Sequence, residues 1–159
     1  AHLAMMKAMG AIPTPMPYGE LYTALAQHVV DGQENPISLI KSSKFYEVQK
    51  YLTIDGHVYS PHALLINDAY LNNFSEPLKK IIVEGSKIWQ KTHRDYSLNQ
   101  NKEGLADIKA SGTEVYTINA GELALFRKAT SKINPVIEKE VGKDLVAQAL
   151  KAVADAEKK

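Results

Sequence analysis

Three side chains of this sequence, Glu34, Asn35 and His57, are the ones best suited to bind a ligand or to move a proton. A carboxylate beside an imidazole can act in acid–base catalysis, and Asp31 would add a second carboxylate to the pair. A small hydrolase that uses Asp31, Glu34 and His57 is therefore one hypothesis. No phosphate-binding loop, zinc motif or activated-nucleophile motif accompanies these residues. The sequence consequently favours a protein that is not an enzyme and has no catalytic residues.

A metal site built from His57, His62 and Glu34 is a second hypothesis. The two histidines are five positions apart. Successive side chains of a strand point to opposite faces, so an odd separation places the two imidazoles on opposite sides. We therefore expect no metal site, and no motif indicates a cofactor.

Asn35 and Tyr18 each lie where one predicted element gives way to another. Asn35 precedes Pro36, and asparagine before proline is typical of a helix N-cap, which would by itself explain the residue. An amide beside a helix N-terminus is also a suitable partner for a carboxylate. Tyr18 follows the proline-rich segment Pro13–Pro17, which must be extended, and either covers the core or faces a ligand. The residue types alone leave these alternatives open.

The elements that would position these side chains follow from hydrophobic spacing and from proline, glycine and capping residues. The longest predicted helix is opened by Ser75 and Pro77 and extends to Ala110, about 50 Å at ~1.5 Å per residue. About five short strands are expected, and the mixed order of elements indicates an α/β fold. Asn67, Asn119 and Asn134 are predicted N-caps, Asn119 in a capping box with Glu122, and Gly142 is predicted to close its helix. The remaining helices are predicted at Ala1–Met9, Gly19–His28, Pro36–Ser43, Asn67–Asn73, Asn119–Ala129, Asn134–Gly142 and Leu145–Val153, and strands at Val29–Gln33, within Tyr51–Asn67 and at Glu114–Ile118.

Composition limits the classes of function. Nineteen basic residues against 18 acidic ones give a net charge of +1, so no overall field favours nucleic acid as a partner. The absence of cysteine excludes disulfides and thiol catalysis and suits a periplasmic protein. No apolar run approaches the ~20 residues that span a bilayer. Because the chain opens inside a predicted helix, we expect it to be a fragment of a longer protein.

A series of short motifs resembles the C-terminal half of the solute-binding proteins of TRAP transporters, the DctP family. The longest of them continues almost without a gap to Asn35 and Pro36. The matching segments are Gly10-Ala11, Pro13–Met16, Glu20–Leu25, Val30–Pro36 and His57–Pro61.

The resemblance implies a fold and a division of the chain. The fold is that of the second lobe of a two-lobed periplasmic-binding-protein-like protein, a short mixed sheet flanked by helices, with one long helix shared between the lobes. Residues 1–60 and 101–159 would form the second lobe, and residues 61–100 would belong to the first lobe.

The resemblance also implies a function, the capture of a small organic carboxylate, such as a dicarboxylate, in the periplasm. The protein would deliver this ligand to the membrane subunits of a TRAP permease. Asn35 matches a contact to the ligand carboxylate, Tyr18 matches an aromatic residue that faces the ligand, and His57 lies near the cleft with Glu34 beside it. The arginine that clamps the carboxylate in this family lies upstream of the position matching Ala1, and Arg94 and Arg127 match nothing in that role.

An alternative is a helical protein-interaction module without a small-molecule ligand, built on residues 77–110 and the last two helices. The apolar residues Leu64-Leu65-Ile66 and the Leu78–Trp89 stripe would be exposed in a monomer of this chain. Exposed apolar surface of this kind drives association, so the chain is expected to self-associate.

Overall fold

The computed structural model describes residues 1–59 and 61–156. Ser60 and residues 157–159, which fall within the segments assigned above, lie outside the description. The chain divides into two compact units, and each is treated by itself. One unit comprises Ala1–Pro17 with Thr117–Lys159, and the other comprises Tyr18–Tyr116.

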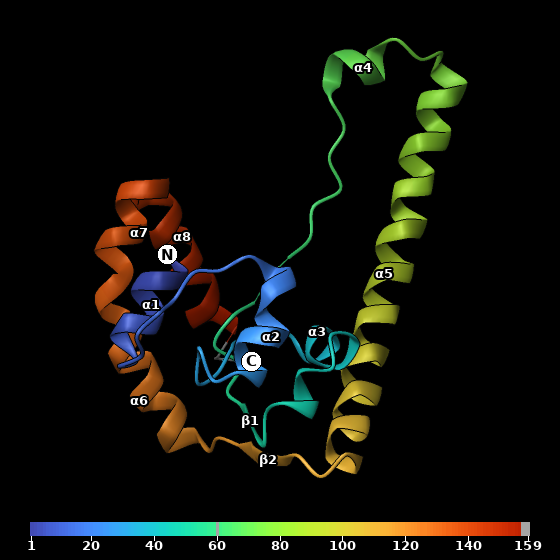
Figure 1. Cartoon of the computed structure of the whole chain (residues 1–159). Coiled ribbons are helices and arrows are strands. Elements are labelled where there is room, and N and C mark those ends of the chain that lie inside the picture. The colour runs from blue at the N-terminus through green and yellow to red at the C-terminus, as the bar shows by residue number, and fades with distance from the viewer. Residues whose placement is uncertain (60, 157–159) are drawn as a thin grey trace. The chain divides into compact units, whose positions relative to one another are not determined.

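Helices dominate the described residues, and most predicted helices are present (Figure 1). Three short 3-10 helices, η1 to η3, complete them. In chain order the elements are α1 (His2–Ala8), η1 (Tyr18–Glu20), α2 (Leu21–Ala26), α3 (Ile37–Ser42), η2 (Phe45–Glu47), β1 (Tyr51–Ile54), α4 (Asp68–Asn72), α5 (Glu76–Ala110), β2 (Glu114–Thr117), α6 (Ala120–Thr130), η3 (Ser131–Ile133), α7 (Asn134–Val141) and α8 (Lys143–Ala156).

The unit of residues 18–116 is organised along α5, the predicted long helix, which has 35 residues. An irregular segment, residues 61–67, leads into α4, which lies at the N-terminal end of α5 (Figure 1). Asn67 caps α4 as predicted, because its side-chain oxygen accepts a hydrogen bond from the Tyr70 amide at 2.9 Å. Within the described ranges 1–59 and 61–156, no helix is both long enough and apolar enough to cross a membrane.

The core of this unit lies where α3 packs on the C-terminal half of α5, and α2 and η2 also contribute buried side chains. Leu25, Phe45 and Ile108 are almost fully buried there, and Ile40 is buried with them. Helix α3 packs directly on α5 at a glycine, Gly104, which has no side chain to hold the two helices apart. This contact fixes the start of α3 and with it the residues that precede it.

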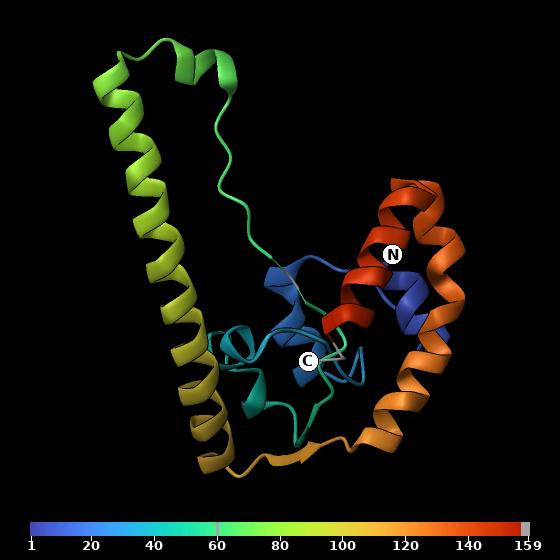
Figure 2. The same cartoon turned by 180° about the vertical axis from the view of Figure 1, so that it is seen from behind.

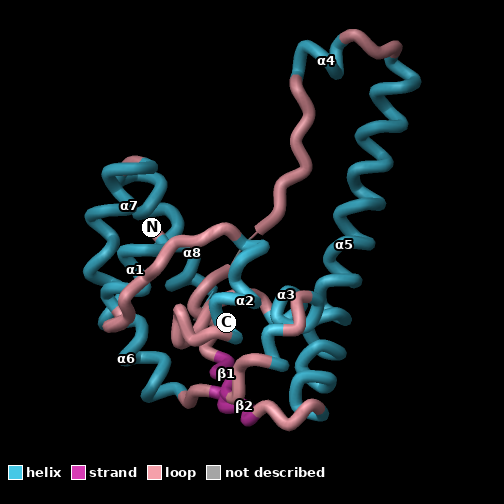
Figure 3. The backbone as a smooth tube through the Cα atoms, in the orientation of Figure 1, coloured by secondary structure: helices cyan, strands magenta, loops and turns pink. Residues whose placement is uncertain are grey.

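The prediction of about five strands is wrong for the described residues, which form a two-stranded sheet of β1 and β2 (Figure 3). Val29–Gln33 is not a strand. It follows His28, whose φ of +56° turns the chain, and β-branched residues form a strand only where a partner strand is available. Two strands, or one long strand bent near Gly56 and Pro61, were predicted within Tyr51–Asn67, but among the described residues of that range only Tyr51–Ile54 is a strand. Two residues later Gly56, with φ of +60°, turns the backbone.

The second unit contains α1 and α6 to α8 (Figure 2). Helix α1 packs on α6 and η3, and α7 packs on α8. The predicted capping box is confirmed, since Asn119 and Glu122 accept hydrogen bonds from each other's backbone amides at 3.0 and 2.8 Å. Asn134 was predicted to cap α7 but is its first residue. The preceding η3 keeps Ile133 in a helical conformation, so no extended capping position remains.

Candidate functional site

Glu34 and His57, two of the predicted site residues, are in contact. Nε2 of His57 lies 3.3 Å from Oε2 of Glu34. The other ring nitrogen, Nδ1, lies 2.6 Å from Oδ1 of Asp55. The side chains of His57 and Asp55 are each 19% exposed, and that of Glu34 is 35% exposed. The imidazole is thus enclosed between two carboxylates in a largely buried cluster.

Asp55 is the member of this cluster that the sequence reasoning missed. The same Oδ1 atom also accepts a hydrogen bond from the His57 backbone amide at 3.4 Å. This local arrangement depends on Gly56, whose positive φ folds the chain back between the two residues. An Asp-Gly pair placed directly before a histidine was the available signal, because aspartate commonly bonds the backbone two residues later.

The positions of the two carboxylates around His57 differ from those that the hydrolase and metal hypotheses required. Asp31, proposed as the second carboxylate of a hydrolase, is exposed, and Asp55 is the residue found on the second imidazole nitrogen. Because Glu34 and Asp55 occupy opposite nitrogens of one ring, the three groups do not converge on a point where an ion would sit. Within residues 1–59 and 61–156 there is no group of three potential metal ligands.

Both contacts of His57 are hydrogen bonds only when the ring carries two protons, because each nitrogen then donates to a carboxylate oxygen. A neutral imidazole has one N–H and would leave a lone pair facing one of the two acids. In either protonation state the ring lies between Glu34 and Asp55 and keeps the two acidic side chains on opposite sides of it.

Asn35 does not cap α3, contrary to the prediction from Asn35-Pro36. The N-cap position is Pro36, and no side chain caps the helix. The amide nitrogen of Asn35 instead donates to Oε1 of Gln33 at 2.7 Å, in a half-buried position next to Glu34. This hydrogen bond uses one of the two amide protons and leaves the other for a further acceptor.

Tyr18 lies at the start of η1 and is in contact with a different set of residues. Its hydroxyl group is 2.6 Å from Oγ of Ser43, and its ring meets that of Phe45 edge-on, with centroids 5.9 Å apart. It therefore covers the buried Phe45, while 49% of its surface stays exposed. The structure brings Glu34 and His57 into contact and places Asn35 against Gln33 and Tyr18 against Ser43 and Phe45.

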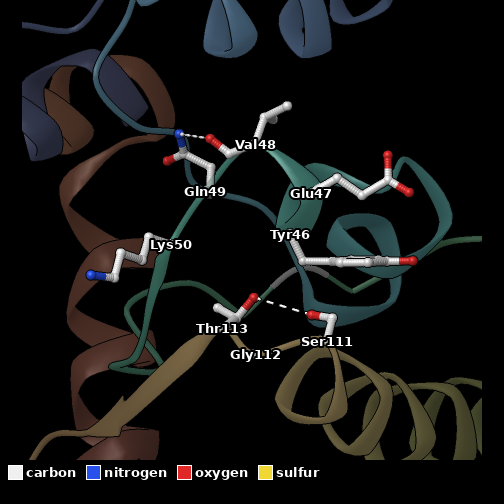
Figure 4. A pocket seen from close by; sticks show the side chains of 8 residues that line it. All are labelled: Tyr46, Glu47, Val48, Gln49, Lys50, Ser111, Gly112 and Thr113. Carbon is white, nitrogen blue, oxygen red and sulfur yellow. Dashed lines mark hydrogen bonds between the residues drawn. The ribbon is translucent and has the colours of Figure 1, made fainter.

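A hollow of about 280 Å³ in the unit of residues 18–116 contains none of the predicted site residues (Figure 4). Its two charged side chains, Glu47 and Lys50, point away from each other (Figure 4). They are engaged elsewhere, Glu47 with the Tyr22 hydroxyl group at 3.0 Å and Lys50 with Glu114 at 3.6 Å. The hydrogen bond to Glu47 raises the pKa of Tyr22 above its ordinary value of 10.0. Because these charges do not converge, the hollow is a poorer candidate for a carboxylate site than the cluster around His57. Its lining residues are Tyr46, Glu47, Val48, Gln49, Lys50, Ser111, Gly112 and Thr113.

Comparison with solved structures confirms the expected fold class. The sugar acid binding protein DctPAm of Advenella mimigardefordensis, solved in complex with galactonate, matches 97% of this chain and 50% of its own with a TM-score of 0.86 and 36% sequence identity. A TRAP periplasmic solute binding protein of a Polaromonas species, bound to D-erythronate, matches 92% of this chain and 48% of its own. The TM-score is 0.80 and the sequence identity is 39%.

Comparison of sequences gives the same assignment. A solute-binding protein of Verminephrobacter eiseniae is 38% identical to this chain over 147 residues, which are 92% of this chain and 43% of that protein. The chain therefore spans less than half the length of this relative. The bacterial extracellular solute-binding protein family 7, DctP, matches residues 1–140. With nearly nine-tenths of its residues covered by that match, the chain belongs to the DctP family of bacterial extracellular solute-binding proteins.

Proposed function

We propose that this chain is part of an extracytoplasmic solute-binding subunit of a TRAP-type transporter. In the periplasm, the subunit captures a small organic carboxylate and delivers it to the membrane subunits of the permease. The observation that carries the proposal is the match of nearly the whole chain to proteins solved with the sugar acids galactonate and D-erythronate. Binding, with no chemical step, is the proposed activity.

Asn35 is the proposed contact to the ligand carboxylate. Its free amide proton can be donated to a carboxylate oxygen, while the hydrogen bond to Gln33 fixes the plane of the amide. His57 and Glu34 are proposed to line the same site, and Tyr18 is proposed to add an aromatic surface.

We also propose that the ligand site draws on the half of the relatives' length that this chain does not span. In this proposal, residues 1–60 and 101–159 belong to the second lobe, and residues 61–100 belong with the first. The strong positive charge that clamps a carboxylate would come from that other half. Arg94 and Arg127, the arginines of this chain, lie on α5 and α6, and neither matches the position of the clamping arginine in the resemblance.

The proposal predicts weak binding by this chain alone. A hydrogen bond to a charged group contributes about 1.5–3 kcal/mol, whereas association costs about 4 kcal/mol or more in lost freedom of motion. Two such bonds together contribute about 3–6 kcal/mol, so at most about 2 kcal/mol remains after that cost, and the dissociation constant should be weaker than 1 mM, which corresponds to about −4 kcal/mol.

The test is an NMR titration of the ¹⁵N-labelled chain with galactonate, D-erythronate and succinate up to tens of millimolar. We expect concentration-dependent shifts of the Asn35 side-chain amide and of the backbone amides of Glu34 and His57. Asn35→Asp should abolish them, because it places a negative charge against the ligand. Asn99→Asp, at an exposed position of α5, is the charge-matched control and should leave the shifts unchanged. Titrations in which Asn35→Asp behaves as the parent would remove Asn35 from the site.

We also propose that this chain self-associates and that a second copy covers the apolar surface around α4 and α5. Leu65, Ile81 and Ile88 are 85%, 63% and 69% exposed. Light scattering on a sizing column should give the mass of a dimer or larger species, and Ile81→Lys with Ile88→Lys should shift it toward the monomer. A monomeric parent chain that binds no hydrophobic dye would contradict this part alone.

A further inference from the structure

Two histidines outside the proposed ligand site, each on a different segment of the chain, face each other. His62 belongs to the irregular segment before α4, and His93 lies in the middle of α5. Nδ1 of His62 is 3.4 Å from Nε2 of His93, and the ring centroids are 5.2 Å apart, with the planes inclined at 57°. The residues are 31 positions apart, so the fold, and not local geometry, brings the two nitrogens together.

The separation of the nitrogens distinguishes two interpretations. Hydrogen bonds donated by nitrogen in proteins usually span about 2.7–3.2 Å, so 3.4 Å is long for a direct bond between the rings. Two nitrogens that bind one tetrahedral zinc ion, each at about 2.0–2.1 Å, are about 3.3–3.4 Å apart. We propose that His62 and His93 form a two-histidine site for a late first-row divalent cation such as Zn²⁺.

The single tryptophan of the chain supports the orientation of one ligand. Trp89, one helical turn before His93, stacks on the His93 ring with centroids 5.0 Å apart and planes inclined at 25°. Stacking restricts rotation of the imidazole, and a fixed ligand ring loses less freedom when it binds a metal. It also places an indole group directly beside the proposed ion, where its fluorescence reports on binding.

The ligand set determines which ions the site takes. Neutral imidazole suits Zn²⁺, Cu²⁺ and Ni²⁺, whereas Mg²⁺ and Ca²⁺ prefer oxygen ligands. The part of the chain that the structure describes supplies no third histidine, aspartate or glutamate to this pair. Water completes the coordination sphere, so the affinity is moderate, and a bound ion cross-links the irregular segment to α5.

The experiment is a titration of the complete chain with ZnCl₂, followed by calorimetry and by tryptophan fluorescence at constant pH. We expect one Zn²⁺ per chain, a change in Trp89 emission that saturates with the heat signal, and no response to MgCl₂ or CaCl₂. His62→Gln and His93→Gln each remove one of two ligands. Mutation of residues that only support metal ligands typically lowers metal affinity by ~10–100-fold. Because each of these variants removes a ligand itself, each should lower the affinity for Zn²⁺ by more than that.

His28→Asn is the matched control. His28 is exposed and has a φ of +56°, a conformation that asparagine tolerates, so this variant removes a surface histidine without strain. It should bind Zn²⁺ as the parent does. Thermal unfolding without zinc should be unchanged in all three variants. The proposal is overturned if the parent gives no saturable signal, or if His62→Gln retains the parent's affinity.

Discussion

The close contact of α3 with α5 makes Gly104 a sensitive test of how the candidate site is positioned. A Cβ atom added at Gly104 would lie 3.3 Å from Cγ2 of Ile37 and 3.4 Å from Cδ of Lys41. Gly85 lies in the same helix at an exposed position, and a Cβ atom there would meet nothing within 4 Å. The two glycines therefore share helix propensity and differ in packing.

Substitution by leucine separates these two effects. Replacing glycine inside a helix by a good helix former stabilises it by about 0.8 kcal/mol. Gly85→Leu should show that gain at a protein concentration where the chain is monomeric, because a Cβ atom at Gly85 meets no other atom of the same copy within 4 Å. Gly104→Leu makes the same gain but must push α3 away from α5, and overpacking of this kind costs about 1–3 kcal/mol. Since the propensity terms cancel, the two variants should differ in unfolding free energy by about 1–3 kcal/mol.

Urea unfolding followed by circular dichroism measures this difference. With a slope of about 1–3 kcal/mol per molar urea, the midpoint of Gly104→Leu should lie about 1 M below that of Gly85→Leu. Gly104→Ala should lie between them, because the short contacts involve side-chain atoms that need to move only slightly. Equal midpoints for the two leucine variants would refute the packing of α3 on α5 and the positioning of Asn35 that depends on it.

Three further predictions concern caps, pH and the site. Asn119→Ala should destabilise the chain by about 1 kcal/mol in thermal unfolding, whereas Ser75→Ala, whose side chain makes no capping bond, should change it little. The hydrogen bond with Asp107 raises the pKa of Lys41 above its ordinary value of 10.5. The stability that this interaction adds to the folded chain is therefore complete below about pH 10.5 and is lost as the pH rises through the pKa of Lys41 in the folded state. The unfolding midpoint of the parent should exceed that of Lys41→Met below this range, and the difference between the two midpoints should shrink as the pH rises through it. Glu34→Gln removes an acidic side chain beside Asn35, so galactonate should bind more tightly in NMR titrations. Weaker binding by this variant would instead mean that Glu34 contacts the ligand directly.

Much of the helical part of the fold was predictable because helix ends depend on local chemistry. Asn67, the Asn119–Glu122 pair and Gly142 act within one turn of their own backbone, and each ends or begins a helix as predicted. The 35 residues of α5 follow from an uninterrupted helical sequence after Pro77. For such features the neighbouring residues contain nearly all the determining interactions.

The strands and the candidate site were less predictable because they depend on distant partners. Val29 and Val30 have high strand propensity, but no neighbouring strand pairs with them in the described structure. Asn35-Pro36 has the residue types of a cap, yet the Asn35 amide group bonds Gln33 instead. The Glu34–His57 contact was expected from family resemblance, whereas Asp55 entered the cluster through the turn at Gly56.

The charges of the cluster indicate how a carboxylate would have to be recognised. The cluster contains two carboxyl groups, those of Glu34 and Asp55, and a single imidazole, so its acidic groups outnumber its basic ones. Such a group repels an anion at short range, while the single free proton of Asn35 contributes one hydrogen bond. The cluster therefore does not neutralise a ligand carboxylate, and Asn35 is held by Gln33 and not by the cluster. A tight site for an organic acid needs a cation beyond this cluster, which is why the proposed function assigns the clamp to the half of the relatives' length that this chain does not span.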